Sequence, residues 1–219
     1  MPPAARHPGS RTTPAASHRP GTANPSVVRS FDWISRIYDN PVVQWFAYRA
    51  NHDAVIAALR SHGASRVVDV GCGTGILAAR IQRELQPEVV YGCDPSAGML
   101  EKSRGRTGEV RWVQGAAEQL PLDDGAVDAV VTTEAFQFFD QPAALNEFHR
   151  VLEPGGHVVI AVITPAVPLP RPVLERVPAT WHTPSGMRRL VEEAGFAVVD
   201  QRRLGRVGPG VATVALKPG

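Results

Sequence analysis

The 219-residue sequence has few of the residues that mark specialised classes of protein. Two cysteines are too few for a disulfide framework or a zinc site, so we expect a reducing, cytoplasmic setting and no metal. No apolar run approaches the ~18 residues that span a bilayer, which argues against integral membrane association. The formal charge is only +2, so nucleic acid is not an expected partner.

Most of the chain has the composition of one globular domain. Apolar residues make up 43% of it and charged residues 20%, and its length suits a single sizeable core. Residues 1–25 differ, because they hold six prolines and three arginines but no acidic residue. Such a segment cannot offset the entropy lost on ordering, so we expect a disordered tail. A transit peptide is the weaker alternative, since no amphipathic helical pattern is visible. Residues 26–219 should form the domain.

Strand and helix patterns alternate through this domain. Short apolar runs typical of buried strands fall at 66–70, 88–93, 110–114, 127–132, 157–163, 196–199 and 211–216. Helical periodicity falls at 76–85, 97–104, 143–152 and 185–194, after a first helix that opens at Pro41 and ends at Gly63. The alternation predicts an α/β fold: a single doubly wound, Rossmann-like domain with a mostly parallel sheet. Outside this alternating pattern lie an N-terminal helical cap (26–63) and a proline-rich loop (164–182), which we expect to cover the functional site.

The most informative segment is the glycine-rich turn after the first strand, where Asp69 precedes glycines at positions 71, 73 and 75. Glycine permits a tight turn and a close approach of a ligand, and the following helix offers unpaired N–H groups. A dinucleotide fingerprint needs glycine at position 76, where this chain has Ile76, so an NAD-dependent oxidoreductase is disfavoured. Asp94, at the end of the second strand, is placed to accept both hydroxyls of a ribose. The pattern predicts a site for an adenosine ribose without a pyrophosphate.

Five motifs follow one another in a recognisable order. They are V-D-V-G-C-G-T-G at 68–75, Y-G-C-D-P-S at 91–96, V-Q-G-A-A-E-Q-L-P at 113–121, V-D-A-V at 127–130 with F-Q-F-F at 136–139, and R-V-L-E-P-G-G at 150–156. The set resembles the class I S-adenosylmethionine-dependent methyltransferases, and most of all the type-11 group with its ubiquinone and menaquinone biosynthesis enzymes. The resemblance covers about residues 31–216. It implies S-adenosylmethionine as cofactor, S-adenosylhomocysteine as product, and a seven-stranded sheet whose last strand is antiparallel.

The resemblance also implies roles for individual residues. The acid and the turn after the first strand would face the methionine part of the cofactor, and the acid after the second strand would bind its ribose. The residues just beyond that acid and the turn at 116–118 would meet the adenine. The end of the fourth strand would lie near the sulfonium, and an N-terminal tyrosine would close over the cofactor. In chain order the implied set is Tyr38, Asp69, Gly71, Cys72, Gly73, Gly75, Asp94, Pro95, Met99, Ala116, Ala117, Glu118, Thr132 and Thr133.

Two positions depart from the family pattern. Ala116 stands where an aspartate often accepts a hydrogen bond from the adenine, a loss of about 1 kcal/mol. Gln137 stands where many relatives have histidine, and glutamine takes up no proton at pH 7. Any proton acceptor must lie elsewhere, and the candidates are His52, Glu134 and His182. Each has a simpler interpretation: a solvent-facing histidine on the first helix, an acid at a helix start, and a residue before a helix cap.

These observations predict an enzyme that transfers a methyl group to a small-molecule acceptor, at an oxygen atom. In-line displacement at a carbon activated by the sulfonium needs alignment and exclusion of water rather than a protein nucleophile. Large aromatic residues, unless they are plain core, favour an apolar or aromatic acceptor: Trp33, Trp45, Phe46 and Trp181. The alternative is a non-catalytic module with the same fold that binds the cofactor or scaffolds a partner. The sequence leaves the oligomeric state open.

Overall fold

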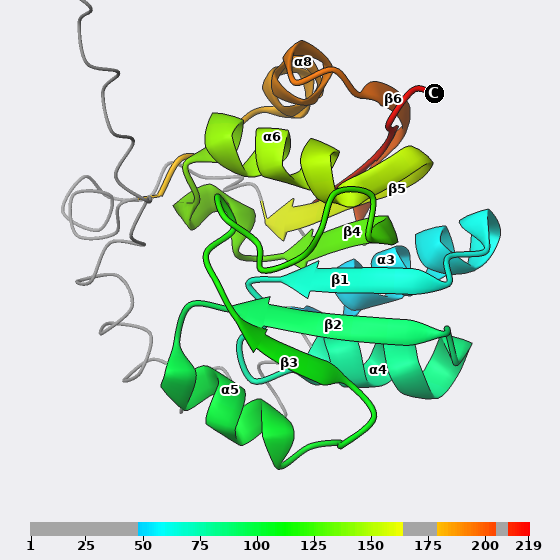
Figure 1. Cartoon of the computed structure of the whole chain (residues 1–219). Helices are drawn as coiled ribbons and strands as arrows, with labels where there is room; N and C mark the ends of the chain where they lie inside the picture. The colour runs from blue at the N-terminus through cyan, green and yellow to red at the C-terminus, as the bar shows by residue number, and fades with distance from the viewer. Residues whose placement is uncertain (1–47, 164–178, 205–209) are drawn as a thin grey trace, which may run out of the picture.

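The computed structural model describes residues 48–163, 179–204 and 210–219 (Figure 1). Its elements are α3 (Arg49–His62), β1 (Arg66–Val70), α4 (Ile76–Leu85), β2 (Val89–Asp94), α5 (Ala97–Arg104), β3 (Arg111–Gln114), β4 (Val127–Thr133), the 3₁₀ helix η2 (Phe136–Phe138), α6 (Gln141–Val151), β5 (Leu152–Ile163), α8 (Pro184–Glu193), β6 (Ala197–Leu204) and β7 (Gly210–Leu216). The expected tail, most of the cap and most of the proline-rich loop lie outside these residues, and so do Tyr38, Trp33, Trp45 and Phe46.

One seven-stranded sheet carries the fold, in the order β3-β2-β1-β4-β5-β7-β6. The pairs among β1 to β5 are parallel, whereas β7 runs antiparallel to both β5 and β6. The predicted sheet, with its antiparallel last strand, is therefore confirmed. The strand order reverses between β1 and β4, and ligands of open α/β sheets bind in the crevice at the carboxyl ends of the strands at such a point.

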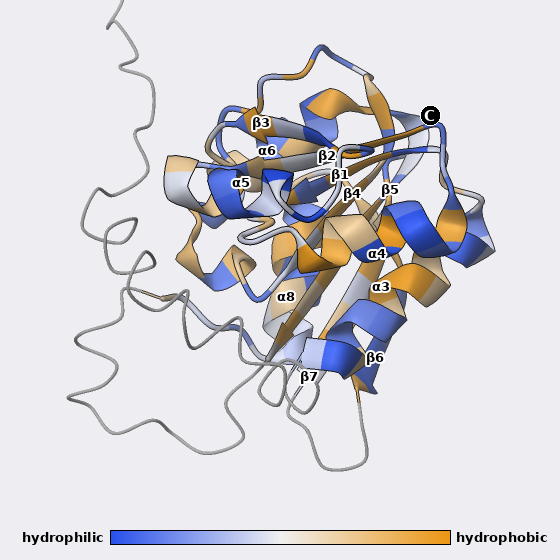
Figure 2. Cartoon of the chain, turned by 90° about the horizontal axis from the view of Figure 1, so that it is seen from below, coloured by the Kyte–Doolittle hydropathy of each residue, from blue (hydrophilic) through white to orange (hydrophobic). Residues whose placement is uncertain are grey.

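Two apolar layers sandwich the sheet. Helices α3 and α4 pack on one face, with Val67 and Val131 among the sheet residues that meet them. Helices α6 and α8 pack on the other, against neighbours such as Val68 and Val130. Figure 1 shows α6 in front of the sheet and α3 and α4 behind it, and Figure 2 shows the apolar strands between the helices. Adjacent strand residues feed opposite layers, which explains the nearly continuous apolar runs.

Local signals account for most helix boundaries. Gly63 ends α3 in the left-handed conformation, as predicted. The Asp140 side chain accepts a hydrogen bond from Ala143 N, so α6 begins two residues before the expected position. β5 also differs, because it begins at Leu152 directly after α6, five residues before the expected start. The 3₁₀ helix η2 was not predicted from the sequence.

Candidate functional site

The glycine-rich turn is fastened to the end of β2. Gly71 N and Cys72 N both donate to Cys93 O, at 2.8 and 3.1 Å, and Gly73 N donates to Asp94 Oδ2 at 2.9 Å. Since β1 and β2 are adjacent and parallel, these bonds join the carboxyl ends of both strands into one unit. The turn is thus held rigid where the sequence predicts a ligand.

The three glycines of the turn have positive φ but serve different ends. A Cβ on Gly71 would lie 2.5 Å from Ala135 Cβ, and a Cβ on Gly75 would lie 2.4 Å from Trp112 Cη2. A Cβ on Gly73 would meet nothing within 4 Å. Gly71 and Gly75 are therefore needed for packing within the protein, whereas Gly73 borders open space. Gly73 is the glycine whose backbone a ligand can approach.

Helix α5, the segment after it and β3 support the glycine-rich turn from outside. Ser103 Oγ donates to Gly73 O at 2.9 Å, and Arg106 Nε donates to Thr74 O at 2.7 Å. The ring of Trp112 packs over Gly75 and donates through Nε1 to Thr107 O at 3.1 Å. The sequence alone does not reveal these residues, because a lone serine, arginine or tryptophan carries no local signal of a contact 30 or more residues away.

Asp94 is a buried acid that binds two backbone N–H groups, one from each side of the site. Its Oδ2 accepts from Gly73 N and its Oδ1 from Ser96 N, both at 2.9 Å. An ionised carboxylate has about four acceptor positions, so it can hold these donors and bind ligand hydroxyls as well. The geometry suits the ribose-binding role implied for Asp94.

Asp69 is the more buried of the two acids, because the residue is only 1% exposed. Burial and the neighbouring charge of Asp94 raise the pKa of Asp69 to about 7, and a backbone hydrogen bond from Ala78 offsets part of this. Its Oδ2 has no hydrogen-bond partner among the described residues. A buried carboxyl with an unused oxygen is suited to bind a ligand cation such as an ammonium group.

The turn implied to meet the adenine follows β3. Ala116 forms an isolated antiparallel bridge with Gln119, and the Ala117 side chain is buried. Glu118 Oε1 accepts from Asp140 N at 2.8 Å, so its carboxylate ties the turn to the start of α6. Ahead of the turn, Pro95 O accepts from Gln114 Nε2, and Met99 is buried in α5. The backbone of 116–118 is thus anchored, and the Glu118 carboxylate binds a backbone N–H of the protein itself.

The end of β4 presents its two threonines in opposite directions. Thr132 follows the face of Val130, toward α6 and α8, and its buried Oγ1 has no partner among the described residues. Thr133 follows the face of Val131 and Asp69, toward α3 and α4. Only Thr133 therefore shares the face of the sheet on which Asp69 lies.

Glu134, directly after β4, combines burial with an unusual backbone. Its φ is +54°, a conformation that costs a non-glycine residue of the order of 1–3 kcal/mol and clusters at functional sites. Asn51 Nδ2, from α3, donates to Glu134 Oε1, although the residues are 83 positions apart. Gln137 Nε2 donates to Glu134 O at 2.8 Å. The carboxylate is thus held at the carboxyl edge of the sheet.

The two candidate histidines differ in their surroundings. The simpler interpretation of His52 as a solvent-facing histidine is wrong, because this residue of α3 is only 8% exposed. Burial and the charge of Arg80 lower the pKa of His52 to about 4, with Asp53 partly opposing this. His182 Nε2 lies 2.6 Å from Gln141 Oε1, which helps hold residues 180–182 against η2 and α6. Gln137 O joins this contact by accepting from Thr180 N at 2.8 Å.

The cysteines of the two strand ends are free thiols. Burial and the nearby charges of Asp94 and Asp69 raise the pKa of Cys93 to about 12, and burial raises that of Cys72 as well. Neither is therefore a thiolate at neutral pH. Within the described ranges, no group of three histidine, cysteine or acidic residues could hold a metal ion. No helix in that part of the chain is long and apolar enough to cross a membrane.

Three features at one edge of the sheet fit the cofactor implied by the resemblance. The unused oxygen of Asp69 suits an ammonium group, the open side of Gly73 admits a ligand chain, and Asp94 suits a ribose. They come from the ends of the adjacent strands β1 and β2, beside the point where the strand order reverses. Nothing in the set requires a pyrophosphate.

Comparisons with known proteins agree with this geometry. A family model described as a methyltransferase domain matches residues 68–160. The malonyl-acyl-carrier-protein O-methyltransferase of Dechloromonas aromatica is 31% identical over 196 residues, covering 87% of this chain and 72% of the relative. The demethylmenaquinone methyltransferase of Beutenbergia cavernae is 30% identical, over 81% of this chain and 85% of its own. A solved S-adenosylmethionine-dependent methyltransferase of Thermotoga maritima, described as a possible histamine N-methyltransferase, superposes with a TM-score of 0.70 at 26% identity, over 86% of this chain and 98% of that one.

Proposed function

Because this chain belongs to the S-adenosylmethionine-dependent methyltransferases, we propose that it methylates a small-molecule acceptor at an oxygen atom. The observation that supports the cofactor site of this proposal is the joined carboxyl end of β1 and β2, where Asp69, Gly73 and Asp94 meet. One relative is named an O-methyltransferase, which supports oxygen as the acceptor atom.

Different residues of the proposed site bind different parts of the cofactor. Asp94 accepts the ribose hydroxyls while it keeps Gly73 N and Ser96 N bound. Asp69 faces the ammonium group, and the backbone of 116–118 faces the adenine. When bound, S-adenosylmethionine supplies a methyl group on a positively charged sulfur that is itself the leaving group. The protein's share is alignment and exclusion of water.

Among the three candidates for proton removal, we favour Glu134. It directly follows β4, next to the point between β1 and β4 where the strand order reverses, and Asn51 fixes its carboxylate. A hydroxyl of the acceptor would pass its proton to the carboxylate of Glu134 as the oxygen attacks the methyl carbon. His52 is buried on α3, and with its pKa lowered to about 4 its ring has no advantage in base strength over an ordinary carboxylate, whereas His182 is engaged by Gln141.

The acceptor would enter beside residues 179–182, which η2 and α6 hold in place. Trp181 belongs to this segment and is half-buried, and Phe139 directly follows η2, where its ring packs edge-on against the buried ring of Phe136. The partly exposed rings of Trp181 and Phe139 favour an acceptor with an apolar or aromatic part. Aromatic faces would also stabilise a sulfonium, by roughly 0.5–2 kcal/mol each.

The test is turnover with a panel of hydroxyl, carboxyl and amine acceptors, measured as S-adenosylhomocysteine formed. We expect a hydroxyl or carboxyl acceptor to be turned over, and Glu134→Gln to lower that rate about 100-fold or more while leaving cofactor affinity within a factor of three. Binding of the cofactor without product from any acceptor would favour the non-catalytic module instead. Preference for amines would contradict oxygen as the acceptor atom.

Cofactor affinity should depend on pH through Asp69. Because its pKa is raised to about 7, this carboxyl is protonated in the free protein at pH 5.5 and must lose the proton to pair with an ammonium group. We expect affinity for S-adenosylhomocysteine to rise roughly tenfold or more between pH 5.5 and 7.5, with proton release on binding. Calorimetry in buffers of different ionisation enthalpy measures both.

Asp69→Asn is the control, because it keeps the shape of the side chain but cannot ionise. It should bind more weakly at pH 7.5 and show no pH dependence from 5.5 to 7.5. For folding the sign is opposite: the folded state holds the Asp69 proton more tightly than the unfolded chain does, so the stability of the unliganded protein falls as pH rises from about 4 to about 7. A wild-type affinity that is flat over this range would contradict the contact between Asp69 and the ammonium group.

A further inference from the structure

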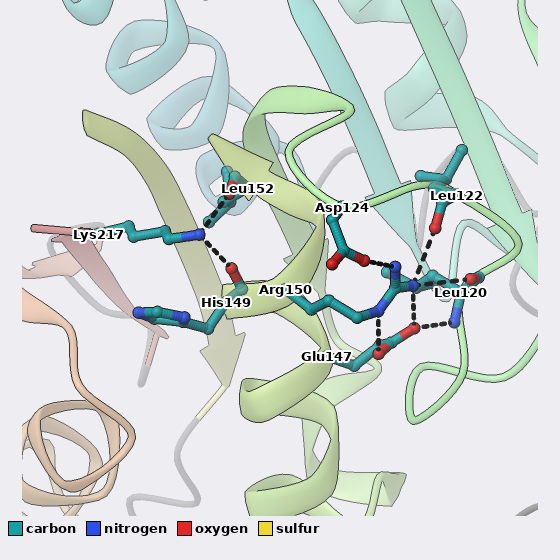
Figure 3. Close-up of polar contacts among 8 residues, drawn as sticks. All are labelled: Leu120, Leu122, Asp124, Glu147, His149, Arg150, Leu152 and Lys217. Atoms are coloured by element: carbon teal, nitrogen blue, oxygen red, sulfur yellow. Dashed lines mark hydrogen bonds and ion pairs between the residues drawn. The ribbon is translucent and has the colours of Figure 1, made fainter. Parts of the chain in front are cut away.

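Arg150 opens the motif at 150–156, to which the proposed function gives no role. It lies in the last turn of α6, and Figure 3 shows its guanidinium reaching the segment 120–124 that follows β3. Nη2 donates to the carbonyls of Leu120 and Leu122, at 3.2 and 2.9 Å, and Nη1 donates to Asp124 Oδ1 at 2.6 Å. One side chain thus binds three residues of a loop some 30 positions earlier.

Glu147, one turn earlier on α6, completes the contact. Its Oε1 accepts from Leu120 N at 2.7 Å, and its two oxygens accept from Arg150 Nε and Nη2 at 2.9 and 2.7 Å. This bidentate pairing fixes the plane of the guanidinium and therefore the direction of its remaining donors. The Glu147 side chain is 12% exposed, whereas that of Asp124 is 83% exposed, so Asp124 should contribute little.

The held segment is continuous with the adenine turn at 116–118. Gln119 N donates to Ala116 O at 3.1 Å, and the Leu120 side chain is buried in the core beneath α6. Pro121 packs so closely on Gly115 that a Cβ there would lie 2.6 Å from Pro121 Cδ. The placement of 120–122 therefore determines the placement of the turn.

We propose that Arg150 and Glu147 are positioning residues for the cofactor: from α6 they hold the turn 116–118 against the adenine without touching it. The inference rests on the proposed function. The placement of this turn by Arg150 and Glu147 is important because Ala116 has no side-chain acceptor for the adenine amino group. Recognition of the base then depends on the backbone of the turn, and backbone groups bind well only when they are already in place.

Arg150→Lys tests the proposal, because lysine keeps the charge but loses the bidentate fork. We expect the Kd of S-adenosylhomocysteine to rise about five- to tenfold by calorimetry. The Kd of adenosine alone should rise by the same factor, since the affected contact is with the base. Backbone amides of 116–122 should exchange hydrogen about tenfold faster, while those of β1 keep their rates.

Lys217→Met is the matched control, since Lys217 Nζ donates to His149 O and Leu152 O on the other side of the same helix end (Figure 3). It should lower the melting temperature but leave the Kd within twofold of wild type. Glu147→Gln keeps an acceptor for Leu120 N and so protects the fold. It should raise the Kd by a smaller factor, about two- to fourfold.

Two results would overturn the proposal. One is an equal loss of affinity in Lys217→Met, which would show a general effect of destabilising α6. The other is faster exchange at 116–122 in Arg150→Lys or Glu147→Gln with an unchanged Kd. Absence of S-adenosylhomocysteine binding by the wild-type protein would instead overturn the proposed cofactor site, so the two failures are distinguishable.

Discussion

Replacing Asp94 with alanine is expected to lower the affinity for S-adenosylhomocysteine about 100-fold or more. Two charge-assisted hydrogen bonds to the ribose would be lost, each contributing roughly 1.5–3 kcal/mol, and 1.4 kcal/mol corresponds to a factor of ten. The change also releases Gly73 N and Ser96 N, so the glycine turn loses its tie to β2. Calorimetric titration of both proteins measures the effect.

Asp94→Asn separates the two contributions. Asparagine keeps one oxygen as an acceptor and the size of the side chain, so affinity should fall by a smaller factor, about tenfold. NAD should bind to neither variant nor to the wild type, because Ile76 removes the glycine that a pyrophosphate site needs. Wild-type affinity in Asp94→Ala would show that the ribose binds elsewhere.

Gly75→Ala should destabilise the folded protein by about 3 kcal/mol or more. The backbone φ of +78° costs an alanine roughly 1–2 kcal/mol. The new Cβ would also lie 2.4 Å from Trp112 Cη2 and 2.8 Å from Cζ3, an overpacking that costs about 1–3 kcal/mol. Denaturant unfolding of variant and wild type gives the difference in free energy.

Gly73→Ala is the matched control within the same turn. Its φ of +55° carries a similar backbone cost, but its Cβ would meet no protein atom within 4 Å. We expect about 1–2 kcal/mol of lost stability. The larger effect should be weaker cofactor binding, because the new Cβ would stand in the open space from which a ligand approaches this glycine. Trp112→Leu should relieve the overpacking, so Gly75→Ala should cost less in that background. Equal costs for Gly73→Ala and Gly75→Ala would contradict the packing of Trp112.

The sequence was a good guide to elements with a local cause. The bounds of β1, α4 and α5 agree with expectation to the residue, because apolar periodicity and nearby glycines determine them. It was a poorer guide where the first residue of an element depends on packing, as at β5, which follows α6 without a loop. Burial of His52 also escaped it, since only contact with α4 brings Arg80 beside that ring.

The sequence by itself determined the order of strands and helices, the glycine turn and the acids that follow β1 and β2, because each depends on neighbours a few residues away. Only the tertiary structure decided which glycine borders open space and which threonine shares a face with Asp69. It also brought Asn51 to Glu134 and Arg150 to Leu120, across 83 and 30 positions. Such contacts depend on how whole elements pack, and no local pattern encodes which distant side chain arrives.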